Sequence, residues 1–299
     1  FFFFFEPVIS SSTIYMGAAD DDNNERCGIY AFDREKESLK WFFKTDNSVK
    51  NRFVLDNGAI FVCDVMHQLY SINAATGKLN WRVSLQDSPQ QTFNMGVCVN
   101  NGMVYAGAVG SLKGVDTATG KIIWKSAWHN GIVSVADIVV KQGILLSIGY
   151  WRGRFALNSK TGEVIWSLLG PEQKFANSTP ILASKKEVHV ATNDIIGGVG
   201  YDGSGRVGSD SVFVCIGEKS VSLVEPETGK ILKNFNLPGE MYVNGSLKPV
   251  IYDSLLIFGT ANEGVVALDM SKNFAQAWNF KTNPSRIYTV PYSKDFQQT

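Results

Sequence analysis

A short motif recurs along this chain and restricts its fold more than any other feature. Its clearest copies run from Asn73 to Trp81, Asp116 to Trp124 and Asn158 to Trp166. Each copy has an Asp or Asn, a Thr-Gly pair three and four residues later, and a tryptophan eight residues after the first position. Counting weaker copies, the first position falls at residues 33, 73, 116, 158, 225 and 269. The period is therefore near 42 residues, with one longer interval between residues 158 and 225.

Each copy predicts a tight turn between two strands. A short Asp or Asn side chain can hold a turn by bonding to its own backbone, and glycine adopts positive φ at little cost. A second hairpin precedes the motif in segments such as 55–63, 99–107 and 252–260, where a polar turn leads into an apolar strand. Four short antiparallel strands per period without helices describe one blade of a β-propeller. We therefore predict an all-β chain.

The number of blades is open between six and seven. Six motif-bearing blades can be counted, and Pro-containing elements that resemble strand entries occur at 6–9, 179–182, 248–251 and 290–292. A seventh blade would be either cut off or completed by the N-terminal phenylalanines, which would remove an open sheet edge. We expect a single propeller domain over residues 1–299. The start at Phe1 is consistent with a trimmed part of a longer chain or with a first strand whose upstream sequence is missing.

The repeat resembles the tryptophan-docking motif of pyrroloquinoline-quinone-like (quinoprotein-type) β-propellers, best seen in Val115 to Trp124. The resemblance covers nearly the whole chain and implies that each motif tryptophan docks against the neighbouring blade. The residues expected to have this structural role are Trp41, Trp81, Trp124, Trp166 and Trp278. Lys233 stands where the fifth copy should have tryptophan, and Trp278 comes one residue late, which we interpret as repeat decay.

The same resemblance argues against a dehydrogenase. Quinoprotein alcohol dehydrogenases hold their cofactor with a disulfide between adjacent cysteines, and no two of the four cysteines here are adjacent. We therefore expect no cofactor. Other members of the family act as scaffolds, and some propellers of this type accompany calcineurin-like phosphoesterase domains, whose motifs are absent from this sequence.

Composition excludes other classes of function. The chain has 28 basic and 28 acidic residues, so it lacks the basic excess typical of nucleic-acid-binding proteins. No apolar run approaches the ~20 residues of a membrane helix. Cys63, Cys98 and Cys215 lie in apolar, strand-like runs, which predicts buried free thiols.

Catalytic and metal-binding motifs are weak. The histidines His67, His129 and His189 form no metal or hydrolase motif, so we predict neither a catalytic residue nor a metal site. Residues 20–25 begin like a calcium loop but lack its glycine and its final glutamate, which favours a solvated loop. The glycine-rich stretch 193–210 is an insertion that either binds a partner or is a tolerated surface loop.

Binding residues are expected where strands enter the blades, because the innermost strands line the axial channel of a propeller. The polar and aromatic candidates there are Arg52, Asn94, Trp151, Arg152, Asn177, Asn244, Arg286 and Tyr288. Aromatic faces beside arginine suit a sugar or a peptide, although the same side chains could simply fill the channel with hydrogen bonds.

The sequence therefore predicts a non-catalytic binding scaffold for a protein or carbohydrate partner. We expect it to be monomeric, not membrane-spanning, and located outside the cytoplasm, in the periplasm or at the cell surface. The alternatives are the accessory propeller of a cell-surface hydrolase or a quinone-dependent oxidoreductase.

Overall fold

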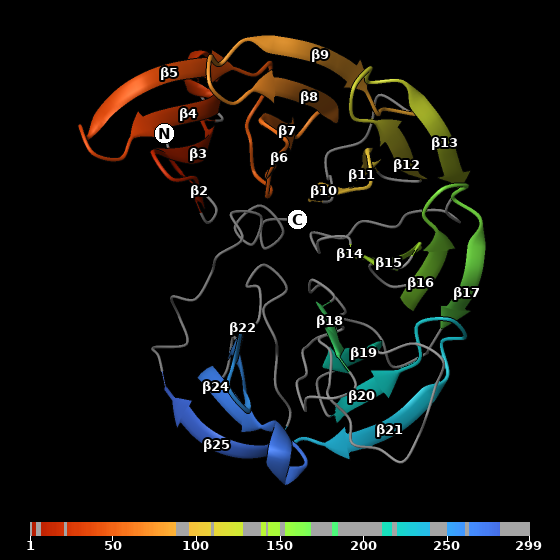
Figure 1. The fold of residues 1–299 in the computed structure, drawn as a ribbon. Coiled ribbons are helices and arrows are strands. Elements are labelled where there is room, and N and C mark those ends of the chain that lie inside the picture. The colour runs from red at the N-terminus through yellow and green to blue at the C-terminus, as the bar shows by residue number, and fades with distance from the viewer. Residues whose placement is uncertain are drawn as a thin grey trace, which may run out of the picture. The chain divides into compact units, whose positions relative to one another are not determined.

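The computed structural model describes residues 2–3, 7–20, 23–87, 96–108, 111–127, 139–141, 143–149, 153–168, 181–184, 211–216, 220–239, 250–260 and 263–281. Over these residues the chain is all-β, with six antiparallel sheets and two short 3-10 helices. Figure 1 shows the sheets in chain order. The all-β prediction is confirmed.

The sheets are numbered here in chain order. Sheet 1 contains β1 (Phe2–Phe3), β2 (Val8–Ile9), β3 (Thr13–Ala19), β4 (Gly28–Asp33) and β5 (Ser38–Lys44). Sheet 2 contains β6 (Val54–Asp56), β7 (Ala59–Cys63), β8 (Gln68–Asn73) and β9 (Leu79–Ser84). Sheet 3 contains β10 (Cys98–Asn100), β11 (Met103–Ala108), β12 (Ser111–Asp116) and β13 (Ile122–Ala127).

The remaining sheets repeat this four-stranded pattern. Sheet 4 contains β14 (Val139–Lys141), β15 (Ile144–Gly149), β16 (Gly153–Asn158) and β17 (Val164–Leu168). Sheet 5 contains β18 (Ile181–Ser184), β19 (Ser211–Ile216), β20 (Ser220–Val224) and β21 (Ile231–Asn236). Sheet 6 contains β22 (Val250–Tyr252), β23 (Leu255–Thr260), β24 (Gly264–Asp269) and β25 (Ala275–Phe280). The 3-10 helices are η1 (Asn24–Arg26) and η2 (Met270–Lys272).

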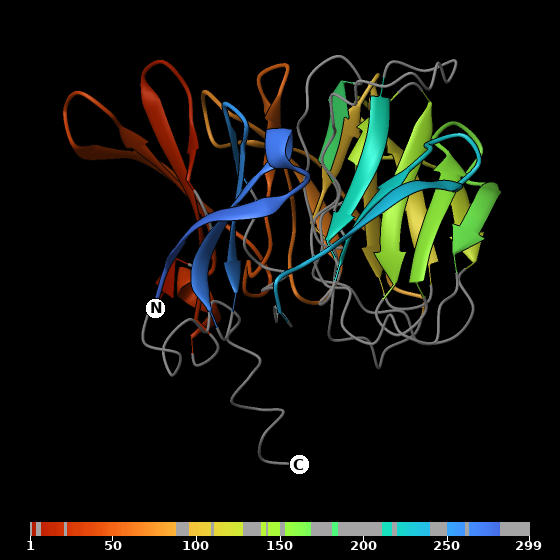
Figure 2. The same ribbon diagram turned by 90° about the horizontal axis from the view of Figure 1, so that it is seen from below.

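Within sheets 2 to 6 each strand pairs with the next one in sequence. The antiparallel course of the strands is visible from the side in Figure 2. Sheet 1 has an additional strand, because Phe2 and Phe3 pair with Ala19 and Ala18 of β3. These two phenylalanines therefore extend the first sheet.

The turns have the backbone that their residues favour. In sheet 2, Asn57 and Gly58 both have positive φ (46° and 77°), as expected for an Asn-Gly hairpin turn. Asn73 Oδ1 accepts hydrogen bonds from Ala75 N (3.1 Å) and Thr76 N (3.0 Å), which holds the motif turn. Gly77 then lies in the left-handed region at φ 70°. The polar residues of the repeat thus determine where the strands reverse.

A β-bulge recurs on the last strand of every sheet in the described chain. In sheet 1, Trp41 pairs with Ala31 while Leu39 pairs with Phe32, so Lys40 is the extra residue. The same shift occurs in sheets 2 to 6. A bulge redirects the side chain that follows it, which here is the motif tryptophan or its replacement.

The core of residues 1–127 lies between successive sheets. Alternate residues of sheet 2 point in opposite directions, as the two-residue period of a strand requires. Ile60 and Val62 pack with Tyr15 and Ile29 of sheet 1, whereas Phe61 and Cys63 pack with sheet 3 residues such as Val104. Sheet 2 is therefore buried on both faces.

The chain divides into two compact units. The first comprises Phe1–Val140 with Ser159–Glu163, and the second Lys141–Asn158 with Val164–Thr299. In the described ranges no helix combines the length and the apolar character that crossing a bilayer requires. In the described part of the chain, Cys27, Cys63 and Cys98 form no disulfide; Cys27 and Cys63 are buried, whereas Cys98 is partly exposed, so burial was overestimated for Cys98.

Candidate functional site

In sheets 1 to 3 the two ends of each sheet carry different side chains, and the candidate site is described by these ends. At one end, the turn after the first strand meets the motif turn, as where Ala74 N donates to Gly58 O (2.9 Å). We call this the docking end. At the other end, the turn after the second strand meets the segments that join neighbouring sheets, as where Leu85 N donates to His67 O (2.8 Å). We call this the connector end.

At the docking end, four tryptophans make the same contact with the next sheet. Each indole N–H donates to the carbonyl of the residue that follows the Asp, Asn or Glu of the next motif. The pairs are Trp41 with Ala74 (3.2 Å), Trp81 with Thr117 (2.9 Å), Trp124 with Ser159 (3.0 Å) and Trp166 with Pro226 (2.6 Å). Each of these four tryptophans therefore links its own sheet to the motif turn that follows in sequence.

The motif glycine provides the surface on which each ring lies. A Cβ added to Gly77 would lie 2.7 Å from Trp41, and one added to Gly162 would lie 2.3 Å from Trp124. Gly120 and Gly229 stand in the same relation to Trp81 and Trp166. The glycine is therefore required both for positive φ and for the close approach of the ring.

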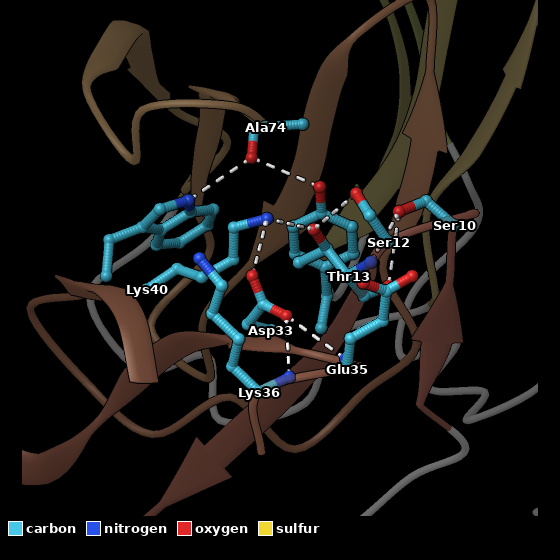
Figure 3. Close-up of polar contacts among 10 residues, drawn as sticks. Ser10, Ser12, Thr13, Asp33, Glu35, Lys36, Lys40 and Ala74 are labelled. Atoms are coloured by element: carbon cyan, nitrogen blue, oxygen red, sulfur yellow. Dashed lines mark hydrogen bonds and ion pairs between the residues drawn. The ribbon is translucent and has the colours of Figure 1, made fainter. Parts of the chain in front are cut away.

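Sheet 1 shows the polar surroundings of this contact in detail. The Ala74 carbonyl also accepts a hydrogen bond from Tyr15 Oη (3.1 Å), so two side chains of sheet 1 bind one carbonyl of sheet 2. Figure 3 shows this carbonyl and also Lys40, whose Nζ donates to Thr13 Oγ1 (3.0 Å) and lies 3.7 Å from Asp33 Oδ2. Asp33 Oδ1 accepts from Lys36 N (2.9 Å), the leading cause of the lowered pKa of this carboxyl.

Between sheets 5 and 6 the docking pair is inverted. Lys233 occupies the tryptophan position opposite Leu223, and Phe274 occupies the glycine position with φ 61°. Phe274 N donates to Asp269 O (2.9 Å), as Gly77 N does to Asn73 O (2.8 Å). The Phe274 ring packs edge-on against Phe235, at 4.6 Å between centroids. In this pair the motif turn of sheet 6 contributes an aromatic ring, Phe274, at the position where the other turns have glycine. The loss of tryptophan at residue 233 is thus accompanied by a second change in the turn that faces it.

Buried polar side chains gather at the connector ends of sheets 1 to 3. In sheet 2, Asp64 is fully buried. It accepts hydrogen bonds from Met66 N (2.9 Å), Gln68 N (3.0 Å) and Tyr70 Oη (3.1 Å). Burial raises the pKa of Asp64, although these hydrogen bonds oppose the shift. Burial, and then the nearby Asp64 charge, raise the pKa of Tyr70.

In sheet 3 a buried lysine is held by the preceding connector. Lys113 is 3% exposed, and its Nζ lies 3.0 Å from Asp87 Oδ2 and 2.8 Å from Ser111 Oγ. Lys125 Nζ lies 2.7 Å from Asp87 Oδ1. Burial acts to raise the pKa of Asp87, but hydrogen bonds from Lys125, Ser111 and Lys113 outweigh it and lower this pKa to about 2. Burial also lowers the pKa of Lys113.

Sheet 1 has a smaller cluster at this end. Asp20 N donates to Cys27 Sγ (3.3 Å) and Ser48 Oγ (3.2 Å), and Asp20 Oδ1 accepts from Asn23 N (3.1 Å). Asp20 is only 8% exposed, so the solvated loop expected from the sequence is wrong at this residue. Residues 21–22 lie outside the described part of the chain. The Cys27 thiol and Ser48 of the connector thus hold the backbone N–H of Asp20.

The connector-end residues differ from sheet to sheet at one cross-strand position. The facing pair is Tyr30 and Phe42 in sheet 1, Tyr70 and Arg82 in sheet 2, and Lys113 and Lys125 in sheet 3. The first pair stacks at 4.3 Å between ring centroids. In sheet 2, Arg82 binds Asp46 of the connector, and in sheet 3 both Lys113 and Lys125 bind Asp87. The same cross-strand position therefore has different side chains in sheets 1, 2 and 3.

Of the eight predicted channel residues, the structure describes one. Arg52 lies two residues before β6 in the connector from sheet 1, partly exposed between the buried residues Asn51 and Phe53. The residues outside the described ranges are Asn94, Trp151, Arg152, Asn177, Asn244, Arg286 and Tyr288. The glycine-rich stretch 193–210 and the histidines His129 and His189 also lie outside them.

Sequence reasoning missed the connector-end clusters. Asp64, Asp87 and Lys113 match no catalytic or metal motif, and their partners are separated by up to 38 residues in the chain. One feature of the sequence could have indicated the cluster of sheet 3. Lys113 lies inside the otherwise apolar β12, at a position where the other copies of the repeat have an aromatic, hydroxyl or aliphatic residue. His67, also buried at this end, has φ 63° and donates its backbone N–H to Asp64 O (3.0 Å). Within the described ranges, no three His, Cys, Asp or Glu side chains gather in a way that could hold a metal ion.

Comparison with solved structures supports the propeller fold. Against BamB from Moraxella catarrhalis, the TM-score is 0.61 at 14% identity over 91% of this chain and 74% of that chain. Against quinohemoprotein alcohol dehydrogenase ADHIIG from Pseudomonas putida HK5, the TM-score is 0.65 at 14% identity, covering 92% of this chain and 59% of the enzyme. At such identities the likeness concerns the fold alone.

One curated relative is a tetrathionate hydrolase from Acidithiobacillus ferrooxidans, 24% identical over 249 residues. The match covers 78% of this chain but 46% of the hydrolase, so the chain spans about half the length of that relative. A family model described as outer membrane protein assembly factor BamB matches residues 25–168 and 71–207. These overlapping matches together cover more than half of the sequence, and the chain therefore belongs to this family of quinoprotein-like β-propeller repeats.

Proposed function

We propose that this chain is a non-catalytic β-propeller scaffold of six or seven blades that binds a protein partner through its connector ends. The observation that carries the proposal is the contrast between the two sheet ends. The docking end repeats the same tryptophan–glycine contact in four pairs, whereas the connector end changes its polar residues in each of sheets 1 to 3. Binding scaffolds typically combine a regular fold with loops and strand ends whose side chains differ from one position to the next.

The exposed residues of this end favour a partner with acidic groups. Arg82 is 57% exposed and lies 3.3 Å from Asp46, and Lys125 is 47% exposed and lies 2.7 Å from Asp87. Each cation is thus held by a carboxylate on one side and open to solvent on the other. A charged group that is already oriented loses less entropy when it binds a partner. The predicted residues Arg52, Trp151 and Arg152 would add to this surface.

Membership in the assembly-factor family supports a protein partner and a location outside the cytoplasm. A carbohydrate partner, the monomeric state and a single domain over residues 1–299 remain predictions. The dehydrogenase shares the fold at 14% identity and the hydrolase matches in sequence at 24% identity, and no further observation favours their activities.

Site-specific photo-cross-linking would test the proposal. A photoreactive amino acid at residue 82 or 125 should cross-link to a discrete protein in native extract. The matched positions Lys78 and Lys121 are exposed at the docking end and should give no such product. Charge reversal at Arg82 and Lys125 should weaken binding of the identified partner and reduce its salt dependence.

Three outcomes would contradict the proposal. The first is equal cross-linking at both ends of the sheets. The second is binding to a glycan array with no protein product. The third is tight stoichiometric uptake of pyrroloquinoline quinone with calcium, measured by absorbance, which would favour the oxidoreductase alternative.

A further inference from the structure

Two lysines face each other at the connector end of sheet 3. Lys113 of β12 pairs directly with Lys125 of β13. Like charges that lie opposite each other on neighbouring strands destabilise a sheet. In the other sheets of the described chain, the pairs at this position are Tyr30 with Phe42, Tyr70 with Arg82, Phe155 with Ser167, Ser222 with Asn234 and Val266 with Asn279. Sheet 3 therefore differs from all of them in having a cation on both strands.

Asp87 holds the two lysines together, because each of its carboxylate oxygens binds one of them. Oδ1 lies 2.7 Å from Lys125 Nζ, and Oδ2 lies 3.0 Å from Lys113 Nζ. Ser111 Oγ donates to the same Oδ2. Both oxygens of the aspartate thus have a cationic donor, which compensates the negative charge.

Lys113 is charged but has no donor left for a binding partner. An ammonium group has three N–H donors. Those of Lys113 are matched by three acceptors, which are Asp87 Oδ2, Ser111 Oγ and the Leu85 carbonyl. The side chain is also buried. Lys113 therefore adds positive charge to the cluster without being accessible itself.

Lys125, by contrast, is accessible and held at one point. Its side chain is 47% exposed, and within the described ranges its polar contact is Asp87 Oδ1. Two of its three N–H donors are therefore open to solvent. Val115, two residues after Lys113 on β12, packs with Phe61 and Cys63 of sheet 2, so both lysines lie on the side of sheet 3 that faces sheet 2. This cluster belongs to the first compact unit.

The charges of this cluster do not cancel. Two lysines and one aspartate leave one positive charge, whereas the Arg82–Asp46 pair of sheet 2 is neutral. Asp46 is 54% exposed and competes with any outside anion for Arg82. A single positive charge matches a carboxylate better than a phosphate group, which carries about −1.5 to −2 and is typically bound by several cations. The excess charge of sheet 3 thus favours one carboxylate at Lys125.

We propose that Lys125 is the subsite at which this chain binds a carboxylate side chain of its protein partner, with Asp87 holding the ammonium group in position. This assignment rests on the proposed function and adds to it the group that is bound and the residue that binds it. Asp87 and the buried Lys113 already compensate each other, so the fold alone does not require Lys125. An oriented cation that is open to solvent loses little entropy when it binds an anion.

Lysine acetylation read by mass spectrometry would test the subsite, with hexaglutamate as the probe. Lys121 is the control, because it is exposed at the docking end of the same sheet. At low ionic strength, hexaglutamate should slow acetylation of Lys125 about fivefold and that of Lys121 less than about twofold. Inorganic phosphate at the same concentration should protect Lys125 less. Equal protection of the two lysines, or stronger protection by phosphate, would overturn the assignment.

The affinity of variants for fluorescent hexaglutamate gives a second measurement. Lys125→Gln should weaken binding about tenfold, whereas Lys125→Arg should stay within about twofold of the wild type because it keeps the charge. Lys121→Gln should have no effect. Asp46→Asn removes the counterion of Arg82 and should strengthen binding about threefold. Undiminished binding by Lys125→Gln, or unchanged binding by Asp46→Asn, would contradict the charge account.

The subsite and the proposed function can fail separately. Suppose that a protein cross-links at the connector end but binds Lys125→Gln as tightly as the wild type. The subsite is then wrong, and the scaffold function stands. If hexaglutamate protects Lys125 but no protein cross-links at residue 82 or 125, the proposed function is wrong, and Lys125 is a carboxylate site without a protein partner.

Discussion

At the scale of single residues, the motif glycines have two separable roles. Gly120 has φ 72° and supports the Trp81 ring, whereas Gly102 in the same sheet has φ 77° and only Thr117 Oγ1, at 3.9 Å, near its added Cβ. Both positions impose backbone strain on any other residue, but Gly120 alone must also leave room for a ring. The pair therefore separates conformational from packing effects.

We expect Gly120→Ala to destabilise the protein by about 3 kcal/mol and Gly102→Ala by about 1 kcal/mol, because overpacking adds to strain in the first variant. Urea unfolding followed by circular dichroism measures both free energies. Equal losses would mean that the Trp81 contact contributes nothing beyond backbone conformation.

Asp87 is an ionised residue of the connector end that holds two lysines. Its pKa is about 2, below the usual 3.8. A carboxyl with a depressed pKa stabilises the folded state above its unfolded value, and this stability is lost as the pH falls through the folded value. The Asp87 contribution should therefore be complete above pH 3.8 and should disappear towards pH 2.

Replacing Asp87 by Asn should destabilise the protein at neutral pH by about 2 kcal/mol, because the buried Lys113 charge and Lys125 lose their counterion. The difference in unfolding free energy between wild type and variant should shrink as the pH falls from 4 to 2. Lys125→Gln serves as a control, since it removes an exposed partner and should cost less than about 1 kcal/mol. A variant whose deficit is the same at every pH would contradict the ionic account.

At the scale of secondary-structure elements, the bulge and the turn act together. The bulge sets the direction of the docking side chain on the last strand, and the motif turn of the next sheet forms its receptor. Between sheets 5 and 6 the docking position and the glycine position have both changed, to Lys233 and Phe274. An aromatic contact is still present there, because Phe274 packs against Phe235.

Restoring the usual pair should show coupling between these two positions. Lys233→Trp alone should destabilise the protein, because the new ring meets Phe274 and the facing Leu223. Phe274→Gly alone should destabilise it by removing a buried ring that is 2% exposed. Combined with Leu223→Ala, the two changes should cost less than their sum by about 1–2 kcal/mol. Additive losses, measured by chemical unfolding of all combinations, would show that the positions do not form a pair.

The elements were largely predictable from the sequence, whereas the candidate site was not. Strand ends, motif turns and Asn-Gly hairpins follow from short-range chemistry, as Asn73 and Asn57 show. The Lys113 cluster depends on Asp87, which is 26 residues away in sequence and approaches only when the connector folds against β12. The inverted pair was equally hidden, because nothing in Phe274 alone indicates that it occupies a glycine position.

At the scale of the whole molecule, the docking contacts link successive sheets, as in other repeat proteins where neighbours share stability. Ser159–Glu163 illustrates this. It forms the motif turn of sheet 4 in sequence, yet it belongs to the first compact unit with Trp124. The Trp124 indole donates to Ser159 O and covers Gly162.

Trp124→Ala should therefore release this turn. We expect amide hydrogen exchange of residues 159–163 to accelerate by about tenfold or more, with little change in sheet 1, because protection is local to the contact that is removed. Trp166→Ala should accelerate exchange around Gly229 instead and leave residues 159–163 unaffected. Uniform acceleration along the chain would indicate a single cooperative unit without local docking.

The sequence by itself determined the all-β class, the repeat near 42 residues, the position of each motif turn and the family, because these depend on contacts within a few residues. The tertiary structure decided how the repeats are joined. It determined that four tryptophans meet a glycine and a carbonyl of the next sheet and that Phe274 inverts one pair. It also brought Asp87 to Lys113, which is 26 residues away in the chain. Such contacts join residues that are distant in sequence and therefore form only when the chain folds. Burial of the side chains then shifts their pKa values and strengthens their interactions.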